Sequence, residues 1–288
     1  MSLAFQNYII TTIVFILLSW GAYLPLRCGQ LYCGIIYCMA GAAYFCGYTT
    51  TALAWAPWLA LVCSPVIGAI FAFLPALFLK RAPGFTTAVA SLALVFILQT
   101  VIMNLEFLGG KVGLFGIPQV KSLLPISVGF FILAGILLHR LDQSRLGRAA
   151  ETLLFNRDVA ASCGVNMDSM GVFLQTAGGA LSGVAGAIFA FNVGGLFPMA
   201  FGFAFLVNVF NMLFIGGSLT IWGPAVFAPI LWGIPLILPK AIAEFKDVIF
   251  GVLLVLVLIL KPEGVVTKST VRAVISSFKG WLVTTRFL

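Results

Sequence analysis

Uncharged carboxamides placed inside long apolar runs are the residues of this chain best suited to chemistry. Gln99, Gln175 and Asn192 each lie within a mostly apolar run, and Asn208 and Asn211 stand three apart, so they share one face of a helix. Neutral amides can form brief hydrogen bonds with a polar or zwitterionic solute. They can equally bond one helix to another, a contact worth about 1 kcal/mol. The pattern alone leaves both roles open.

Motifs for catalysis are missing from the sequence. It has no Gly-x-x-x-x-Gly-Lys-Ser/Thr phosphate loop, no His-Glu-x-x-His, no Gly-x-Ser-x-Gly and no carboxylate pair within an apolar run. The single histidine is His139, and none of the six cysteines forms a Cys-x-x-Cys pair, so a metal site is not expected. We therefore predict no catalytic residue, no metal and no cofactor on this chain.

Composition identifies a membrane protein. Of 288 residues, 62% are hydrophobic and 8% are charged, whereas about a quarter of the residues of a soluble domain are charged. The 16 Lys and Arg residues against 8 Asp and Glu give a net charge of +8. This charge collects in the connections and the tail, so it reports orientation in a membrane and does not indicate nucleic acid.

The apolar runs predict an all-α, polytopic bundle of about nine transmembrane helices, because a bilayer core of about 30 Å needs roughly 20 apolar residues per helix. The expected spans are 8–26, 30–50, 57–79, 85–107, 122–139, 171–194, 201–217, 222–239 and 248–260. The distribution of Lys and Arg places the N-terminus outside and the C-terminus in the cytoplasm. Residues 1–266 would form the membrane domain, and 267–288 a basic, amphipathic cytoplasmic tail.

A polar segment from Arg140 to Met170 interrupts the apolar runs and carries eight charged residues. It must face water, since a charge at bilayer depth costs at least ~2.5 kcal/mol. We expect a helix, a turn and a second short helix, capped by Asp158 and stopped by Gly164. Apolar residues at spacings of three and four would share one face of the first helix: Leu146, Ala150, Leu153 and Leu154. A solvated loop that binds nothing is the alternative.

Several blocks, taken in order, resemble the LivM-type permeases of branched-chain amino acid ABC importers, over roughly residues 20–266. The blocks are Gly29-Gln30-Leu31, Gly34 and Ala42-Ala43-Tyr44; Ser91-Leu92-Ala93, Gly109-Gly110, Gly113 and Gly116-Ile117-Pro118; Ser144 to Ala149; Asp158 to Ala161 with Gly164-Val165-Asn166; Ala180 to Ala187; Phe197-Pro198; Ile215-Gly216-Gly217; and Trp222-Gly223-Pro224. Their order and spacing carry the resemblance.

This resemblance implies a heterodimer with a second permease subunit, two cytoplasmic ATPase subunits that bind ATP and Mg, and a periplasmic solute-binding protein. The membrane would be a bacterial inner membrane. The segment 140–170 would couple the permease to the ATPase, through the residues Arg145, Gly147, Arg148, Glu151, Leu154, Phe155, Arg157, Asp158 and Gly164.

Polar residues of the second, fourth, sixth and seventh expected spans would then line the solute path. These residues are Gln30, Tyr32, Gln99, Asn104, Gln175, Asn192, Asn208 and Asn211. Tyr32 and Ile35 stand where the family has Ser and His, and the family also includes permeases for urea and small amides. The solute is therefore a branched-chain amino acid or a related small polar molecule. An ATP-independent carrier or channel for a small neutral solute is the alternative function.

Overall fold

The computed structural model describes residues 3–120, 122–237, 246–261 and 264–266. The chain divides into two compact units, Met1–Phe210 and Asn211–Leu288. The expected tail, 267–288, lies outside the described residues. Nearly all described regular structure is helical, so the prediction of an all-α bundle is confirmed.

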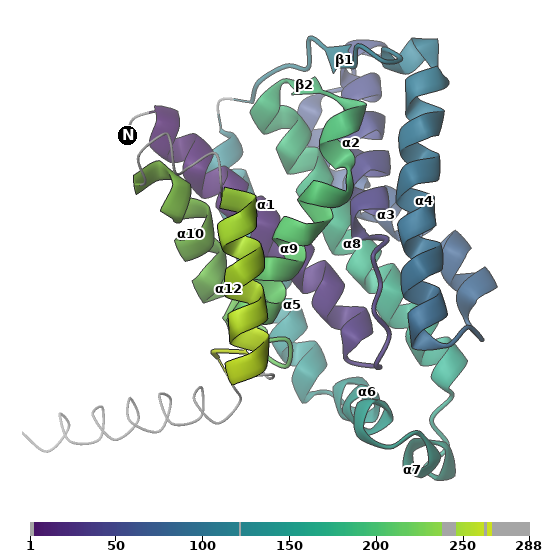
Figure 1. The fold of residues 1–288 in the computed structure, drawn as a ribbon. Helices are drawn as coiled ribbons and strands as arrows, with labels where there is room; N and C mark the ends of the chain where they lie inside the picture. Colours follow the sequence, from purple (N-terminus) through teal and green to yellow (C-terminus); the bar gives the residue numbers. More distant parts are fainter. Residues whose placement is uncertain (1–2, 121, 238–245, 262–263, 267–288) are drawn as a thin grey trace, which may run out of the picture. The chain divides into compact units, whose positions relative to one another are not determined.

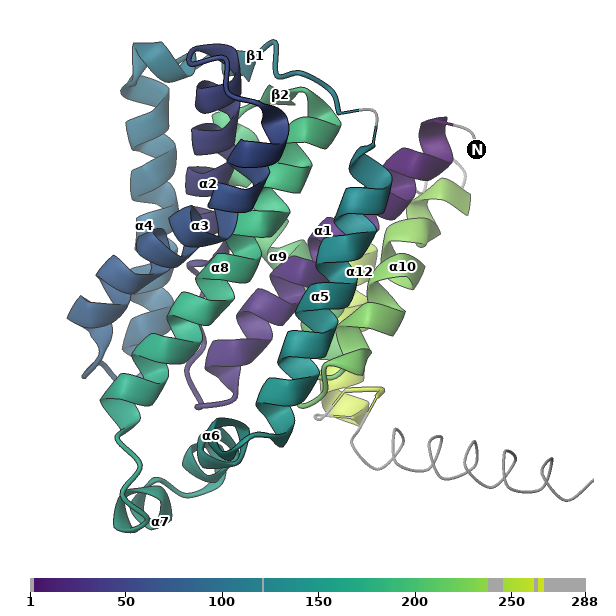
Figure 2. The same cartoon turned by 180° about the vertical axis from the view of Figure 1, so that it is seen from behind.

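The first unit contains the long helices (Figure 1). Its helices are α1 (Leu3–Leu26), α2 (Ile35–Thr51), α3 (Pro57–Leu79), α4 (Gly84–Asn104), α5 (Leu123–Gln143), α6 (Arg145–Phe155), α7 (Arg157–Ser162) and α8 (Met167–Val193), with the short 3-10 turns η1 (Glu106–Leu108) and η2 (Pro198–Phe201). Two short strands, β1 (Leu114–Phe115) and β2 (Gly195–Leu196), pair antiparallel, with Leu114 opposite Leu196. The strands lie at one end of this unit, and α6 and α7 lie at the other (Figures 1 and 2).

The helix α9 (Phe203–Gly216) crosses from the first unit into the second, which also holds α10 (Trp222–Ile237) and α12 (Lys246–Leu260). Within the second unit, residues 264–266 run back along the end of α9. The backbone N–H of Val266 donates to the carbonyl of Gly216 over 2.9 Å, and Thr220 Oγ1 donates to the carbonyl of Val266 over 3.0 Å. These bonds fix the chain after α12 to the turn between α9 and α10.

Each expected span corresponds to a helix, but the helices differ in length. Five described helices are long and apolar enough to cross a membrane: α1, α3, α4, α5 and α8. The others are shorter; α9, with 14 residues, rises about 21 Å at 1.5 Å per residue, less than a bilayer core. A count of nine spans therefore stays a prediction.

The boundary of α2 corrects one expectation. We expected the second span to begin at residue 30, but α2 begins at Ile35. Gly29 adopts a left-handed backbone with φ of +71°, which ends the turn after α1 and starts an extended connection. Gln30 and Tyr32 therefore lie in the loop before α2, not within a transmembrane helix.

Small residues allow α8 to pack directly against three other helices of the first unit, α1, α2 and α3. A Cβ added to Gly183 would collide with the carbonyl oxygen of Ser64 on α3, and one added to Gly178 would collide with the carbonyl oxygen of Gly21 on α1. Backbones this close gain van der Waals contact, which drives helix association in lipid. The glycines of α8 therefore serve packing.

Replacing Gly183 with Leu should prevent folding of the first unit, since the added side chain would force α8 away from α3 and overpacking costs about 1–3 kcal/mol or more. Gly129→Leu on α5 is the matched control, because nothing lies within 4 Å of a Cβ at that position. Size-exclusion profiles in detergent measure the outcome: G183L should aggregate and G129L should elute as the wild type. Equal profiles would contradict the packing role.

Candidate functional site: the polar segment and its buried anchor

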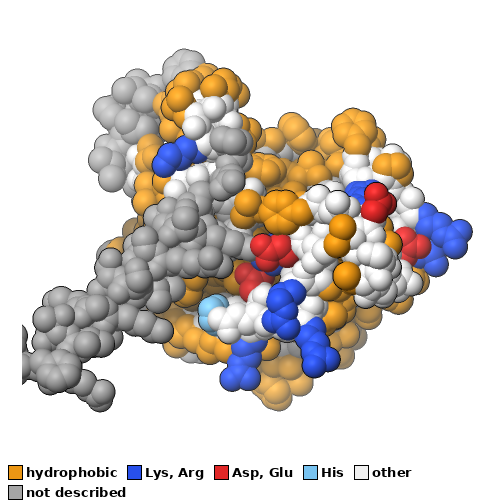
Figure 3. Space-filling model, turned by 90° about the horizontal axis from the view of Figure 1, so that it is seen from below, with side chains coloured by type: hydrophobic (Ala, Val, Ile, Leu, Met, Phe, Trp, Pro, Cys, Tyr) orange, Lys and Arg blue, Asp and Glu red, His pale blue; other side chains and the backbone are white. Residues whose placement is uncertain are grey.

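The polar segment expected between residues 140 and 170 lies at one end of the first unit, where charged side chains gather (Figure 3). It comprises the last turn of α5, the helices α6 and α7, and the start of α8. We call residues 140–170 the coupling segment. Its two short helices confirm the expected helix, turn and helix.

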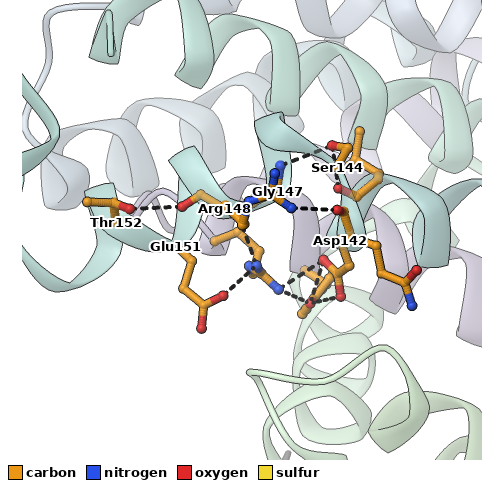
Figure 4. Close-up of polar contacts among 10 residues, drawn as sticks. Asp142, Ser144, Gly147, Arg148, Glu151 and Thr152 are labelled. Carbon is orange, nitrogen blue, oxygen red and sulfur yellow. Dashed lines mark hydrogen bonds and ion pairs between the residues drawn. The ribbon is translucent and has the colours of Figure 1, made fainter. Parts of the chain in front are cut away.

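A buried arginine anchors this segment to α1. Arg27, directly after α1, is 4% exposed. Its Nη1 donates to Asp142 Oδ1 over 2.9 Å, and its Nη2 donates to the carbonyl of Gly147 over 3.2 Å. A longer contact of 3.4 Å joins Nη2 to Glu151 Oε2. Asp142, Gly147 and Glu151 thus converge from α5 and α6 on one guanidinium group (Figure 4).

Tyr23, one turn earlier on α1, completes the cluster. Arg27 Nη1 donates to the hydroxyl oxygen of Tyr23 over 2.7 Å, and that hydroxyl donates to Asp142 Oδ2 over 3.0 Å. Burial disfavours the charged form of Arg27, but Tyr23 and Asp142 outweigh this effect and raise the pKa of the guanidinium above its ordinary value. Arg27 therefore remains charged, and the cluster holds the start of α6 against α1. We name Arg27, Tyr23, Asp142, Gly147 and Glu151 the anchor cluster.

The turn between α5 and α6 requires a glycine. A Cβ added to Gly147 would lie 2.6 Å from the carbonyl oxygen of Asp142. Ser144 caps α6, since its Oγ accepts from the backbone N–H of Gly147 over 3.2 Å. Gly147 therefore faces the bundle and sets the rotation of α6 about its own axis.

That rotation corrects the predicted apolar face of α6. Ala150 and Leu153 share a face as expected, and that face is buried against the bundle, but Leu146 is 46% exposed. The residue that shares their buried face is Gly147, because its contact with the end of α5 turns the neighbouring Leu146 outward. Leu154 lies beside the turn after α1, with its Cδ1 3.7 Å from the position of a Cβ on Gly29.

The cap of α7 is a second correction. We predicted Asp158, but Asn156 caps this helix: its Oδ1 accepts from the backbone N–H groups of Asp158, over 3.1 Å, and Val159, over 3.2 Å. Asn156 has the extended backbone of a cap residue, and Asn ranks with Asp at this position. The helix ends at Ser162, and Gly164 follows with φ of +77°, close to the predicted stop.

Several residues that the resemblance implicates in coupling are exposed. Phe155 is 73% exposed, and the other exposed members are Arg145, Arg148, Arg157, Asp158 and Gly164. Arg148 Nη1 donates to the carbonyl of Gln143 over 2.8 Å, which steadies its side chain at the surface. The exposed surface of α6 and α7 therefore carries three arginines, one carboxylate and an aromatic ring.

Of the residues expected to line a solute path, Gln30 and Gln175 are brought together. Gln175 Nε2 donates to Gln30 Oε1 over 2.8 Å. Gln175 is 1% exposed, and its Oε1 is buried without a hydrogen-bond partner among the described residues. An unpaired buried acceptor costs about 1–3 kcal/mol, so this oxygen is suited to receive a donor.

The other expected path residues do not join this pair. Gln99 Nε2 donates to the carbonyl of Pro198 over 3.3 Å, close to the end that carries the strands. Asn104 and Asn208 each donate to a carbonyl four residues earlier on their own helix. The side-chain amides of Asn104 and Asn208 thus each make a hydrogen bond within their own helix.

Tyr32, Asn192 and Asn211 are the remaining residues expected on the solute path. Tyr32 is 1% exposed, with its hydroxyl 3.8 Å from Cys38 Sγ, and Asn192 is half-buried near the end of α8. Asn211 is 2% exposed, and among the described residues its Oδ1 has no hydrogen-bond partner. We found no group of three or more potential metal ligands within the described part of the chain.

Arg27 and Tyr23 are site residues that the sequence alone does not identify. In the sequence, Arg27 counts only among the Lys and Arg residues whose distribution reports orientation. The available signal was an arginine directly after an uninterrupted apolar run, since such a residue near bilayer depth generally pairs with another group. The sequence does not identify its partner, because Asp142 lies 115 residues further along the chain.

Loss of the Arg27 cation should destabilise the anchor cluster. Arg27→Met would remove the donor that Asp142 Oδ1 and the Gly147 carbonyl share. We expect the free energy of unfolding to fall by about 2–4 kcal/mol, less than for a fully buried pair, because the carboxylates are partly exposed. Thermal unfolding in detergent measures this decrease in stability. The control, Arg140→Met, removes an exposed arginine and should shift stability by less than about 0.5 kcal/mol. Equal effects of the two variants would contradict an anchoring role.

Comparison with known proteins supports the resemblance. Residues 4–258 match a family model described as branched-chain amino acid transport system, permease component. Over 150 residues the chain is 28% identical to the high-affinity branched-chain amino acid transport system permease protein LivM of Escherichia coli strain K12, and 27% identical to that of Salmonella typhimurium strain LT2. Each match covers 51% of this chain and 34% of the relative, so the matched stretch spans about a third of these relatives. No solved structure matches.

Proposed function

Since this chain belongs to the family of branched-chain amino acid transport permease components, we propose that it is the permease subunit of an ABC importer and forms a solute path with a second permease subunit. The family places it among transport components and not among enzymes. The observation that carries the proposal is the coupling segment, whose inner face is held by Arg27 and whose outer face is left exposed.

The geometry divides the proposed coupling residues into two sets. Gly147, Glu151 and Leu154 contact or face the bundle and hold the segment in place. The exposed set would contact the ATPase: Arg145, Arg148, Phe155, Arg157 and Asp158, with Gly164 ending the segment. Phe155 would supply an apolar anchor, since exposed aromatic and arginine side chains are favoured at such contacts. ATP and Mg would bind to the two partner ATPase subunits.

For the solute path, we propose the Gln30–Gln175 pair as the first polar contact to test. The unpartnered Oε1 of Gln175 could accept from an amino or amide N–H group. Gln99, Asn104, Asn192, Asn208, Asn211 and Tyr32 remain proposed path residues. The solute would be a branched-chain amino acid or a related small polar molecule, delivered by a periplasmic solute-binding protein.

The proposed location is a bacterial inner membrane, with the N-terminus outside and the coupling segment in the cytoplasm. The exposed arginines of the coupling segment support this orientation, because short cytoplasmic connections are enriched in Lys and Arg. The apolar residues exposed along α3, α4 and α5 suit contact with lipid or with neighbouring subunits.

Replacing Arg148 and Asp158 together with Ala should reduce uptake of radiolabelled leucine at least tenfold, since both side chains are exposed on the proposed ATPase contact. The chain should still fold, because neither side chain is buried. Uptake would be measured in cells that co-express this chain with the proposed second permease, ATPase and solute-binding subunits. Normal uptake by this variant would contradict the coupling role.

A matched control changes one acid and one base at the other end of the first unit. Glu106 and Lys111 are both exposed there, and Glu106→Ala with Lys111→Ala should leave uptake within about twofold of the wild type. Solute flux through the purified chain alone, driven by an ion gradient and indifferent to ATP, would instead favour the ATP-independent carrier.

A further inference from the structure

A groove between α3 and α8 joins an apolar wall to a basic end. Its volume is about 560 Å³. The wall is formed by Phe73 and Leu77 on α3 and by Val172 and Phe173 on α8, and the phenyl rings and Leu77 are exposed. Thr176, a polar residue of this wall, bonds within its own helix, since its Oγ1 donates to the carbonyl of Val172 over 2.7 Å. The wall therefore offers an apolar surface.

The basic end of the groove carries more positive than negative charge. Lys80 and Arg81, which follow α3, face the carboxylate of Asp168 at the start of α8. Arg81 Nε lies 3.8 Å from Asp168 Oδ2, and both side chains are substantially exposed, so this ion pair contributes little. A second cavity, of about 170 Å³, shares these three residues and adds Arg157. The linings of the two cavities thus include three cations and one carboxylate.

The dimensions of the groove suit one leaflet of a bilayer. From Phe73 to Lys80 the helix rises about 10 Å, at 1.5 Å per residue. Half of a hydrocarbon core is about 15 Å. Aromatic and aliphatic side chains would then lie at acyl-chain depth, while Lys80 and Arg81 would lie at the level of the headgroups, where cations attract anionic lipid.

We propose that this groove binds a phospholipid with an anionic headgroup. One acyl chain lies along Phe73, Leu77 and Phe173, and the phosphate contacts Lys80 and Arg81. A soluble anion would use the basic end and leave the apolar wall uncovered, and an apolar helix of another subunit would cover the wall without using the cations. A lipid matches both parts of the groove. Bound there, it bridges the turn after α3 and the start of α8, which is the last part of the coupling segment.

The test counts bound lipids on the purified full chain by native mass spectrometry, after titration with phosphatidylglycerol or with phosphatidylcholine of the same acyl chains. The wild type should retain more phosphatidylglycerol than phosphatidylcholine. Lys80→Ala with Arg81→Ala should weaken that binding roughly 20-fold, since each cation near a membrane contributes about fivefold. Arg81→Lys preserves the charge and should keep the preference.

Arg140→Ala is the matched control for Arg81→Ala, because Arg140 is also exposed at this end but lies outside the groove. It should leave phosphatidylglycerol binding unchanged. The proposal would be overturned if Arg81→Ala and Arg140→Ala weakened phosphatidylglycerol binding equally, or if the wild type retained the two lipids equally. It would also be overturned if millimolar inorganic phosphate displaced phosphatidylglycerol. The last result would indicate a site for a soluble anion. None of these readouts depends on transport.

Discussion

The burial of one charged group, the guanidinium of Arg27, is the constraint on which the geometry of the coupling segment depends. A charge removed from water must be paired and hydrogen-bonded, and Arg27 finds its partners on α5 and α6, far along the chain. The cluster therefore fixes α6 to the end of α1. A displacement of α6 would be transmitted to α1, and through the glycine contacts of α1 with α8 to the centre of the first unit.

Glycine and charge serve complementary purposes in this structure. Gly178 and Gly183 remove side chains where α8 meets α1 and α3, so that backbones touch and the bundle behaves as one body. At the end of that bundle, Gly147 removes a side chain so that α6 can turn sharply and offer its carbonyl to Arg27. The exposed cations and Phe155 are thus presented on a short helix whose position is set by buried contacts.

Much of this fold is predictable from periodicity and composition, because apolar runs long enough for lipid leave few alternatives to helices. The helices of the coupling segment were also predictable, since their polar pattern and glycines are local signals. The pairing of Arg27 with Asp142 was not, as nothing local links residues 115 positions apart. The rotation of α6, which exposes Leu146 and buries Gly147, depends on a tertiary contact with α5. The hydrogen bonds of the Asn104 and Asn208 side chains to carbonyls of their own helices likewise become evident only in the structure.

Chemical labelling of Cys163 tests most directly whether the outer face of the coupling segment docks on an ATPase. Cys163 is exposed directly after α7, whereas Cys28 is buried and burial raises the pKa of its thiol to about 12, so that it stays protonated. In inverted membrane vesicles from a Cys63→Ala background, a membrane-impermeant maleimide should label Cys163 of the chain expressed alone. Co-expression of the ATPase subunits should slow this labelling at least fivefold. An unchanged rate in the assembled complex, or labelling only in right-side-out vesicles, would contradict the account.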